Sequence, residues 1–358
     1  MLAIRSALNA TFVTSFALLV LNSPLAAQTE RRTLSGDAVA IYNLAGKLRI
    51  ESGSGSDVVV EITRGGRDAD RLRVEQGNVG GHEALRVIYP TDHVVYAELG
   101  RWSRTTVNVR DDGTWGDDHS RDYSSRERNR VEISGSGSGL DAYADLRVLV
   151  PRGQRIVIRQ AAGTARITTV EADLSVEVSS SDITAERTRG HLSLDTGSGS
   201  VSVTDAQGDV DLDTGSGSVT IAGVRGETLR MDTGSGSIHG SEIDVADLKA
   251  DVGSGGVRLE RVRANRVDVD AGSGGTELEL LTNVERLKVD AGSGGVTIRL
   301  PASTGANVDI ETGSGGIDTD FAVQVTRFEQ NHMVGTIGNG RGQIRIESGS
   351  GHVRLLKG

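Results

Sequence analysis

Asp213-Thr214-Gly215-Ser216-Gly217-Ser218-Val219-Thr220-Ile221 is one copy of a motif that recurs through the second half of this 358-residue chain. Each copy begins with an acidic residue, which a Gly-Ser-Gly turn follows. Successive acidic residues are 18, 19, 19, 19, 20, 21 and 36 positions apart, and they are Asp195, Asp213, Asp232, Asp251, Asp270, Asp290, Glu311 and Glu347. A nearly fixed period of this size is typical of a solenoid, in which a short unit stacks on copies of itself.

The residues on both sides of each turn alternate between apolar and polar. In the copy at residues 286–300, Leu287 and Val289 precede the turn, and Val296 and Ile298 follow it. This alternation predicts half-buried strands. We expect the glycines to supply positive φ angles at the turn. The sequence therefore predicts an all-β fold, a β-solenoid with rungs of ~18–21 residues.

The first 27 residues are organised like a cleaved signal peptide. Arg5 precedes an apolar run that ends at Leu21, and Ala27 supplies a small residue at the cleavage site. The chain has no cysteine, which excludes a disulfide framework and a lipid attached to a cysteine. No other stretch is long and apolar enough to cross a membrane. We therefore expect an exported protein, periplasmic or at the cell surface, with no transmembrane span after signal cleavage.

The mature chain divides into two predicted parts. Residues 28–150 are predicted to form an irregular N-terminal β cap with a long polar insert at 91–130, and residues 151–358 to form the regular solenoid. Residues 321–341 interrupt the period and are interpreted as a modified rung. Fainter copies of the motif begin at Glu51, Glu132, Arg159 and Glu177.

The acidic residues at the turns are predicted to project outward in one column, about 4.8 Å apart. Like charges at that spacing repel by roughly 1 kcal/mol per pair in water. We expect each carboxylate to accept hydrogen bonds from the backbone of its own turn. The alternative is Ca²⁺ bridging neighbouring rungs, but the glycine-rich calcium repeats use a shorter period, so the prediction is a structural turn ladder with no metal and no cofactor.

Two motifs suggest catalysis but lack its context. Asp-Thr-Gly-Ser resembles the aspartic-protease signature, which needs two facing carboxylates; here the acids are predicted to stack along one edge. Gly-Ser-Gly resembles a phosphate loop, which needs a following helix, and no helical pattern follows. The chain is therefore predicted not to be an enzyme. The alternative from another class is a polysaccharide-active enzyme on a β-helix, which would need acids and a base clustered in a groove.

The polar insert is the predicted contact surface. Net charge is −10, which argues against a nucleic-acid partner. Exposed aromatic residues with arginines suit carbohydrate or protein binding, and the alternative is that these rings pack back on the cap. The candidate contact residues of the insert are Tyr96, Arg101, Trp102, Arg104, Trp115 and Tyr123.

Taken with its serial [DE]-x-Gly-Ser-Gly rungs, the strand Leu146–Gly153 and the ending Ile344–Gly351, the chain resembles the bacterial putative-adhesin family, a β-strand-repeat domain of unknown function. The resemblance covers about residue 40 to 358. It implies a β-solenoid in the cell envelope and supplies no catalytic residues. The predicted function is a non-enzymatic interaction or adhesion scaffold, with an envelope polysaccharide or a protein as its partner; a calcium-stabilised binding module is a further alternative.

Overall fold

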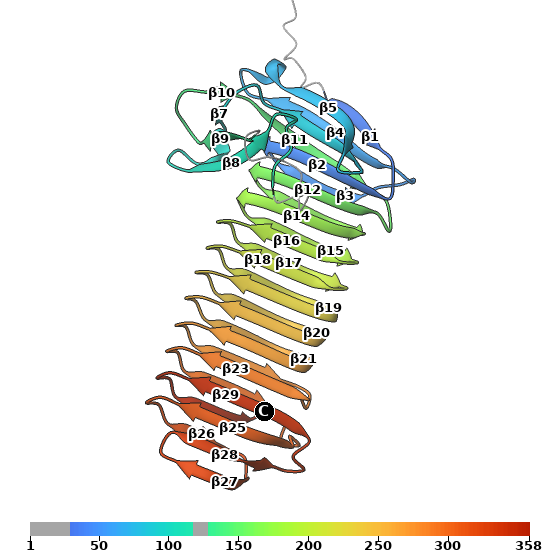
Figure 1. The fold of residues 1–358 in the computed structure, drawn as a ribbon. Coiled ribbons are helices and arrows are strands. Elements are labelled where there is room, and N and C mark those ends of the chain that lie inside the picture. The colour runs from blue at the N-terminus through green and yellow to red at the C-terminus, as the bar shows by residue number, and fades with distance from the viewer. Residues whose placement is uncertain (1–28, 117–127) are drawn as a thin grey trace, which may run out of the picture.

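The computed structural model describes residues 29–116 and 128–358, and it confirms an all-β fold. A solenoid of stacked rungs carries a wider cap at its N-terminal end (Figure 1). The described residues form no α-helix, only the short 3₁₀ turns η1 (Ala69–Arg71) and η2 (Ala97–Leu99). Among them there is no helix that could span a membrane. The signal peptide predicted at residues 1–27 lies outside the described part of the chain.

Each rung contributes a strand to two parallel ladders, which we name the first and second faces. The first face holds the strands before the Gly-Ser-Gly turns: β2 (Ala38–Ala45), β12 (Arg155–Ala162), β14 (Asp173–Ser180), β16 (Leu192–Thr196), β18 (Val210–Thr214), β23 (Arg286–Ala291), β29 (Gly342–Ser348) and β25 (Ala306–Thr312). The second face holds the strands after the turns: β3 (Leu48–Ser52), β13 (Ala165–Glu171), β15 (Ile183–Arg189), β17 (Val201–Gln207), β22 (Thr276–Leu280), β24 (Val296–Leu300), β30 (Val353–Lys357) and β26 (Ile317–Thr319). Three long strands bend from the second face into the first face of the next rung: β19 (Val219–Thr233), β20 (Ile238–Val252) and β21 (Val257–Ala271).

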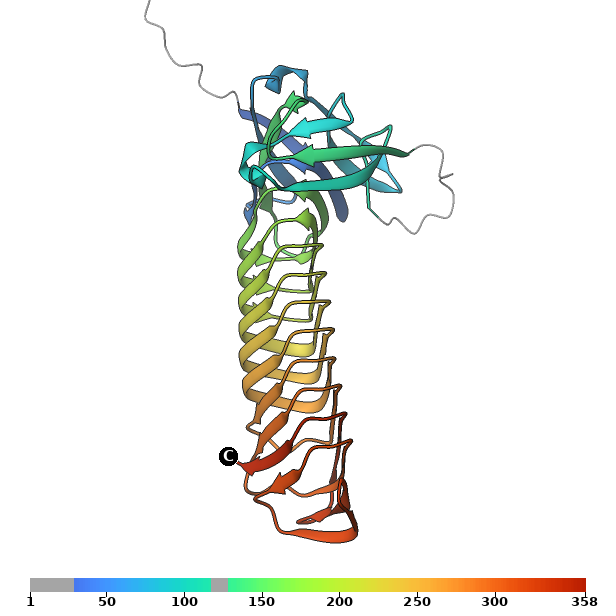
Figure 2. The same cartoon turned by 90° about the vertical axis from the view of Figure 1, so that its left-hand side faces the viewer.

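The two faces are stacked ladders that enclose the core (Figure 2). The core is built from in-register columns of small aliphatic side chains. On the first face Met231 pairs with Ala250, Ala250 with Val269, and Val269 with Val289. All four are buried. Each rung therefore depends on its neighbours for the burial of its apolar side chains, as expected for a solenoid.

The glycines of the turns serve close packing rather than positive φ, which corrects the sequence-based expectation. None of the turn glycines from Gly197 to Gly294 has a positive φ. A Cβ added to Gly217 or to Gly236 would lie 1.8 Å from the carbonyl oxygen of the equivalent glycine one rung earlier. Any side chain at this position would therefore push adjacent rungs apart.

Positive φ occurs instead at the opposite corner, where each rung leaves the second face. The residue there recurs once per rung, and its φ lies between 52° and 70° in Thr169, Arg187, Asp205, Gly223, Glu242 and Arg261. Only Gly223 adopts this conformation without Cβ strain. Residue types at this position differ from rung to rung, so no sequence pattern predicts its positive φ.

The last rung along the chain is not the last rung in space. The strand β29 pairs with β23 on one side and β25 on the other, and β30 lies between β24 and β26 in the same way. Residues 342–357 thus return to fill a gap that the chain had left. The end itself is an antiparallel hairpin, β27 (Val323–Glu329) with β28 (His332–Ile337), that packs on β25. The predicted modified rung at 321–341 is therefore a hairpin cap.

The N-terminal end has the same kind of insertion. The strand β11 (Tyr143–Val150) lies between β3 and β4 (Val58–Gly65), and β1 (Thr29–Leu34) pairs with the outer side of β4. On the first face, β6 (His82–Ile88) pairs with β2, and β5 (Arg73–Val79) lies outside β6. Residues 38–52 form a complete rung that stacks on residues 155–171, across the boundary predicted at 150.

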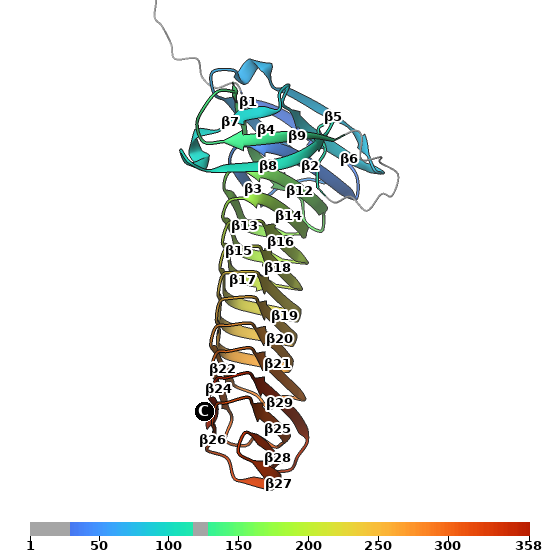
Figure 3. The ribbon, with the colours of Figure 1, turned by 60° about the vertical axis from the view of Figure 1, so that its left-hand side comes forward.

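The polar insert forms a second sheet on the cap (Figure 3). The four strands of this sheet are β7 (His93–Val95), β8 (Arg104–Arg110), β9 (Arg128–Ser134) and β10 (Leu140–Asp141), so the sheet also includes residues that follow the insert. The strand β9 pairs with β8 on one side and β7 on the other. The described part of the insert thus belongs to a folded layer of the cap.

Val269→Asp should lower the melting temperature strongly, because Val269 is fully buried between two rungs and a carboxylate there has no partner. An unpaired polar group in such a core costs several kcal/mol, roughly 2–7 for a neutral one. The matched control is Asp268→Asn, since Asp268 points outward 3.8 Å from Lys288. Thermal unfolding followed by circular dichroism should separate the two variants, and equal melting temperatures would contradict the core columns.

Candidate functional site

The eight acidic residues of the turns form one continuous column on the first face, which Glu177 extends by one rung. Strand pairing places Glu177 beside Asp195, and continues without interruption through Asp213, Asp232, Asp251, Asp270 and Asp290 to Glu347 and then Glu311. Arg159 takes the equivalent position one rung before Glu177 and donates a hydrogen bond to it at 2.8 Å. The column predicted from the sequence is therefore present, with the order of its last two members reversed.

The carboxylates do not cap the turns, which corrects the sequence-based interpretation. The next residue does: the buried Thr214 hydroxyl accepts a hydrogen bond from the Gly217 amide at 3.0 Å and donates one to the Gly199 carbonyl at 2.7 Å. Thr233 makes the same pair of contacts with Gly236 and Gly217. Because the Thr side chain points inward, its hydroxyl lies inside the turn, whereas the Asp side chain points away from it.

Ionisation of the column is least favourable near its N-terminal end. Loss of hydration, together with the charges of Asp213 and Glu177, raises the pKa of Asp195 to about 6. Loss of hydration is also the main reason why the pKa of Asp213, Asp232 and Asp270 is raised. Within the described residues no group of three or more His, Cys, Asp or Glu side chains is arranged to hold a metal ion.

Two of the predicted contact aromatics are buried and cannot face a partner. Tyr96 is 2% exposed and packs on Tyr143 with ring centroids 5.5 Å apart. Trp115 is 3% exposed, and its backbone forms an isolated antiparallel β-bridge with Val109 of β8. Both rings pack back on the cap, the alternative left open by the sequence. Tyr123 lies outside the described residues.

Trp102 has the opposite environment. Its side chain is 89% exposed, and it lies on a turn that the Ser103 amide closes by donating to the Gly100 carbonyl at 2.9 Å. The Arg101 guanidinium lies 5.4 Å from the centroid of the Trp102 ring. Arg101 and Arg104 are also exposed. The structure thus keeps Arg101, Trp102 and Arg104 together at the surface.

A neighbouring loop holds this turn in place, and sequence reasoning had missed it. The Ser136 hydroxyl donates to the Arg101 carbonyl at 2.7 Å, and the Gly135 amide donates to the Ser103 carbonyl at 3.0 Å. A Cβ on Gly135 would lie 1.8 Å from the Gly100 carbonyl oxygen, so only glycine allows this approach. The signal was visible as Ser134-Gly135-Ser136-Gly137, but it was interpreted as a faint rung.

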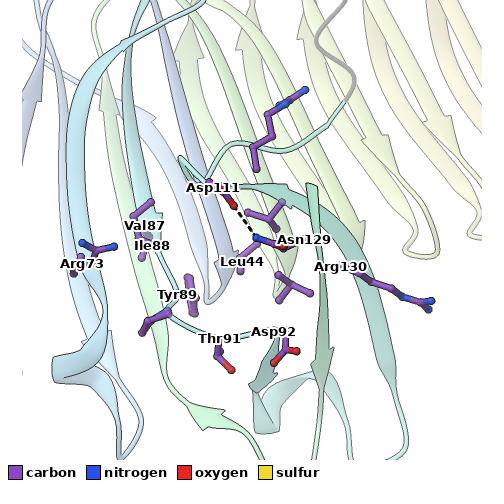
Figure 4. A pocket seen from close by; sticks show the side chains of 15 residues that line it. Leu44, Arg73, Val87, Ile88, Tyr89, Thr91, Asp92, Asp111, Asn129 and Arg130 are labelled. Carbon is purple, nitrogen blue, oxygen red and sulfur yellow. Dashed lines mark hydrogen bonds between the residues drawn. The ribbon is translucent and has the colours of Figure 1, made fainter. Parts of the chain in front are cut away.

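A cleft of about 460 Å³ lies between the two sheets of the cap, lined by β6, β8 and β9 (Figure 4). Apolar side chains such as Leu44, Val87 and Ile88 line it together with polar ones, among them Asp111, which accepts a hydrogen bond from Asn129 at 2.8 Å. The Tyr89 hydroxyl is already bonded to Asn43 at 2.9 Å, and burial raises its pKa. The cleft can hold an apolar group with a polar edge, but it brings no nucleophile and base together.

A shallower groove of about 320 Å³ crosses the first face and is rich in cations. Its charged lining residues are Arg230, Asp247, Lys249, Arg266, Asp268, Arg286 and Lys288. Arg266 donates to Asp247 at 2.6 Å, and this bond is the main cause of the lowered pKa of Asp247. A general base for neutral pH needs a pKa near 7, so this carboxylate is poorly suited to acid–base catalysis.

Comparison with known proteins shows a similarity in the regular part of the solenoid. Residues 191–356 match the family model described as Toastrack DUF4097, and the resemblance to a β-strand-repeat domain of unknown function is confirmed there. No relative was found among curated proteins. A solved structure described as a "putative cell adhesion protein" from Clostridium sporogenes is 11% identical, with 92% of this chain and 99% of that chain covered at a TM-score of 0.20.

Replacing the hydroxyl of two buried threonines should have opposite effects. Thr276 stands in a column of valines, and its buried hydroxyl has no hydrogen-bond partner. Thr276→Val should therefore raise the free energy of unfolding by about 1 kcal/mol, whereas Thr214→Val should lower it by about 1–2 kcal/mol by leaving a turn amide unpaired. Urea denaturation of both variants measures the difference, and a shift of the same sign in both would contradict the capping role of Thr214.

Asp195→Asn should stabilise the protein at pH 8 and have less effect at pH 5. The pKa of Asp195 is raised in the folded state, so the ionised carboxylate is unfavourable above about pH 6, and this penalty disappears as the pH falls through that value. The melting temperature of the wild type should approach that of the variant on acidification. Asp70→Asn, at an exposed position in η1, is the control and should show no such convergence. A calcium-dependent rise in the wild-type melting temperature would instead favour ion bridging.

Proposed function

We propose that this protein is an exported, non-enzymatic scaffold that makes contacts within the cell envelope or at the cell surface. The solenoid is a rigid support of repeated flat faces, and the cap at one end carries the least regular surface. Binding residues tend to lie on loops that a rigid scaffold positions. The observation that carries the proposal is the exposure of Trp102 on an ordered turn. The residues before and after Trp102 are both held by hydrogen bonds from a neighbouring loop.

An exposed tryptophan on a fixed turn is suited to recognition. The ring offers a large apolar surface, and its turn is already ordered by the contacts of Gly135 and Ser136, so binding would cost little conformational entropy. Aromatic and arginine side chains dominate the energetics of binding surfaces. Arg101 and Arg104 supply hydrogen-bond donors beside the ring.

The partner that we favour is an envelope polysaccharide. One face of a sugar ring is apolar and packs on an indole, while its hydroxyls accept hydrogen bonds from guanidinium groups and exchange them with serine hydroxyls. The exposed Ser136 and Ser138 lie in the loop beside the Trp102 turn. A protein partner would use the same tryptophan as a buried anchor, and the experiment below distinguishes the two.

Trp102→Ala should reduce binding to insoluble cell-wall polysaccharide at least tenfold and leave the melting temperature nearly unchanged, because the ring buries almost no surface within the fold. Cosedimentation measures the binding, and a pull-down from envelope extract tests for a protein partner. Leu281→Ala is the matched control, since Leu281 is also an exposed apolar residue but belongs to the solenoid. Unchanged binding of Trp102→Ala in both assays would move the contact surface away from the cap.

A further inference from the structure

The strand β27 leaves one edge of the long sheet open at the C-terminal end. Within the described residues it pairs with β28 alone, so its other side presents unpaired backbone donors and acceptors. Such an edge is a template for pairing with another strand. In Figure 3 this strand is the outermost element at the end opposite the cap.

The columns of core side chains also end at this strand, where no further rung of the described chain covers the last apolar residues. On the first face Ile346 pairs with Ile310, Ile310 with Met333, and Met333 with Phe328. The first three are buried, but Phe328 is 70% exposed, and Val325 on the same strand is 47% exposed. Only four large apolar side chains of the described residues are exposed, and two of them belong to β27.

We propose that β27 is a self-association surface, and that a second copy of this chain pairs with it in antiparallel orientation. Two solenoids would then meet end to end about a two-fold axis, with the caps at the far ends. The two first faces would meet through residues 327–329 of each strand, because β27 ends at Glu329, and the Phe328 rings would cover each other at the centre. This inference is independent of the proposed function.

Charge complementarity supports a second copy and fixes the register. When Phe328 faces Phe328 of the other copy, Arg327 of each chain faces Glu329 of the other. Opposite charges directly across an antiparallel pair are favourable. Within one chain the two side chains already interact at 3.4 Å, so the strand has no net charge that would repel its copy.

The opposite end of the solenoid does not offer a matching surface. Its outermost strand β1 carries Glu30, Arg31 and Arg32, and none of the four exposed large apolar residues lies on β1 or β5. Pairing of the C-terminal end with the N-terminal end would generate a filament, whereas pairing of two C-terminal ends closes after two copies. The expected assembly is therefore a dimer.

The test is light scattering coupled to size-exclusion chromatography on the chain without its first 27 residues, supported by a charge exchange. The wild type should elute with the mass of two chains. Arg327→Glu and Glu329→Arg should each be monomeric, because each places like charges opposite each other in the homodimer. A mixture of these two variants should recover the dimeric mass, since every cross-strand pair is again of opposite charge.

Two controls separate the proposal from misfolding and from other contacts. Both charge variants should keep the circular dichroism spectrum of the wild type and unfold cooperatively, because the side chains are exposed. Arg263→Glu, at an exposed position in the middle of the solenoid, should remain dimeric. A monomeric wild type overturns the proposal, and so does a dimer that persists in both charge variants or a mixture that stays monomeric.

Discussion

The contact between successive Gly-Ser-Gly turns is the constraint on which the rest of the solenoid depends. The second glycine of each turn lies against the carbonyl of its counterpart in the adjacent rung, too close for any Cβ. The distance along the chain from the acidic residue to the first strand residue on the core side of the second face is six residues, as from Asp213 to Val219. The extra residue of the longer rung that follows Asp213 falls after the positive-φ corner, between Arg225 and Leu229. The turns therefore set the register, and the segment that returns to the first face absorbs this insertion.

In-register stacking places residues of the same kind from successive rungs side by side, which is favourable for some residue types and unfavourable for others. It builds the columns of Val, Leu and Ile and the column of capping threonines, but it also stacks the carboxylates. Beside the C-terminal half of the acidic column, the neighbouring outward column contains Arg230, Lys249 and Lys288. Beside Asp195 it contains only Ser175 and Ser193. The carboxylate most resistant to ionisation, Asp195, lies at this end because it loses hydration there and because Asp213 and Glu177 add like charges.

The period of the sequence was sufficient to predict the solenoid, because one motif decides each turn locally. It could not reveal features that arise from distant pairing. Glu51 begins a plausible copy of the motif, yet it pairs with Thr168 on the second face, and Tyr42 takes the equivalent place in the acidic column. Residues 342–357 look like a further rung, but they insert between two earlier ones. In the insert, Trp102 and Trp115 have similar polar neighbours in sequence, and only the packing of the second sheet decides that one is buried and the other exposed.

Both ends of the solenoid solve the same problem, since a terminal rung lacks a neighbour on one side. In each case the chain leaves a gap and later fills it, with β11 at one end and with β29 and β30 at the other. Fraying then requires removing a strand that is paired on both sides, so the terminal rungs gain the stability of internal ones. The outermost layers differ, however. At the N-terminal end the second sheet is added to the cap, whereas at the C-terminal end a single hairpin leaves Val325 and Phe328 partly uncovered. The two ends of the rod thus differ chemically, with the exposed Trp102 turn at one end and the open edge of β27 at the other.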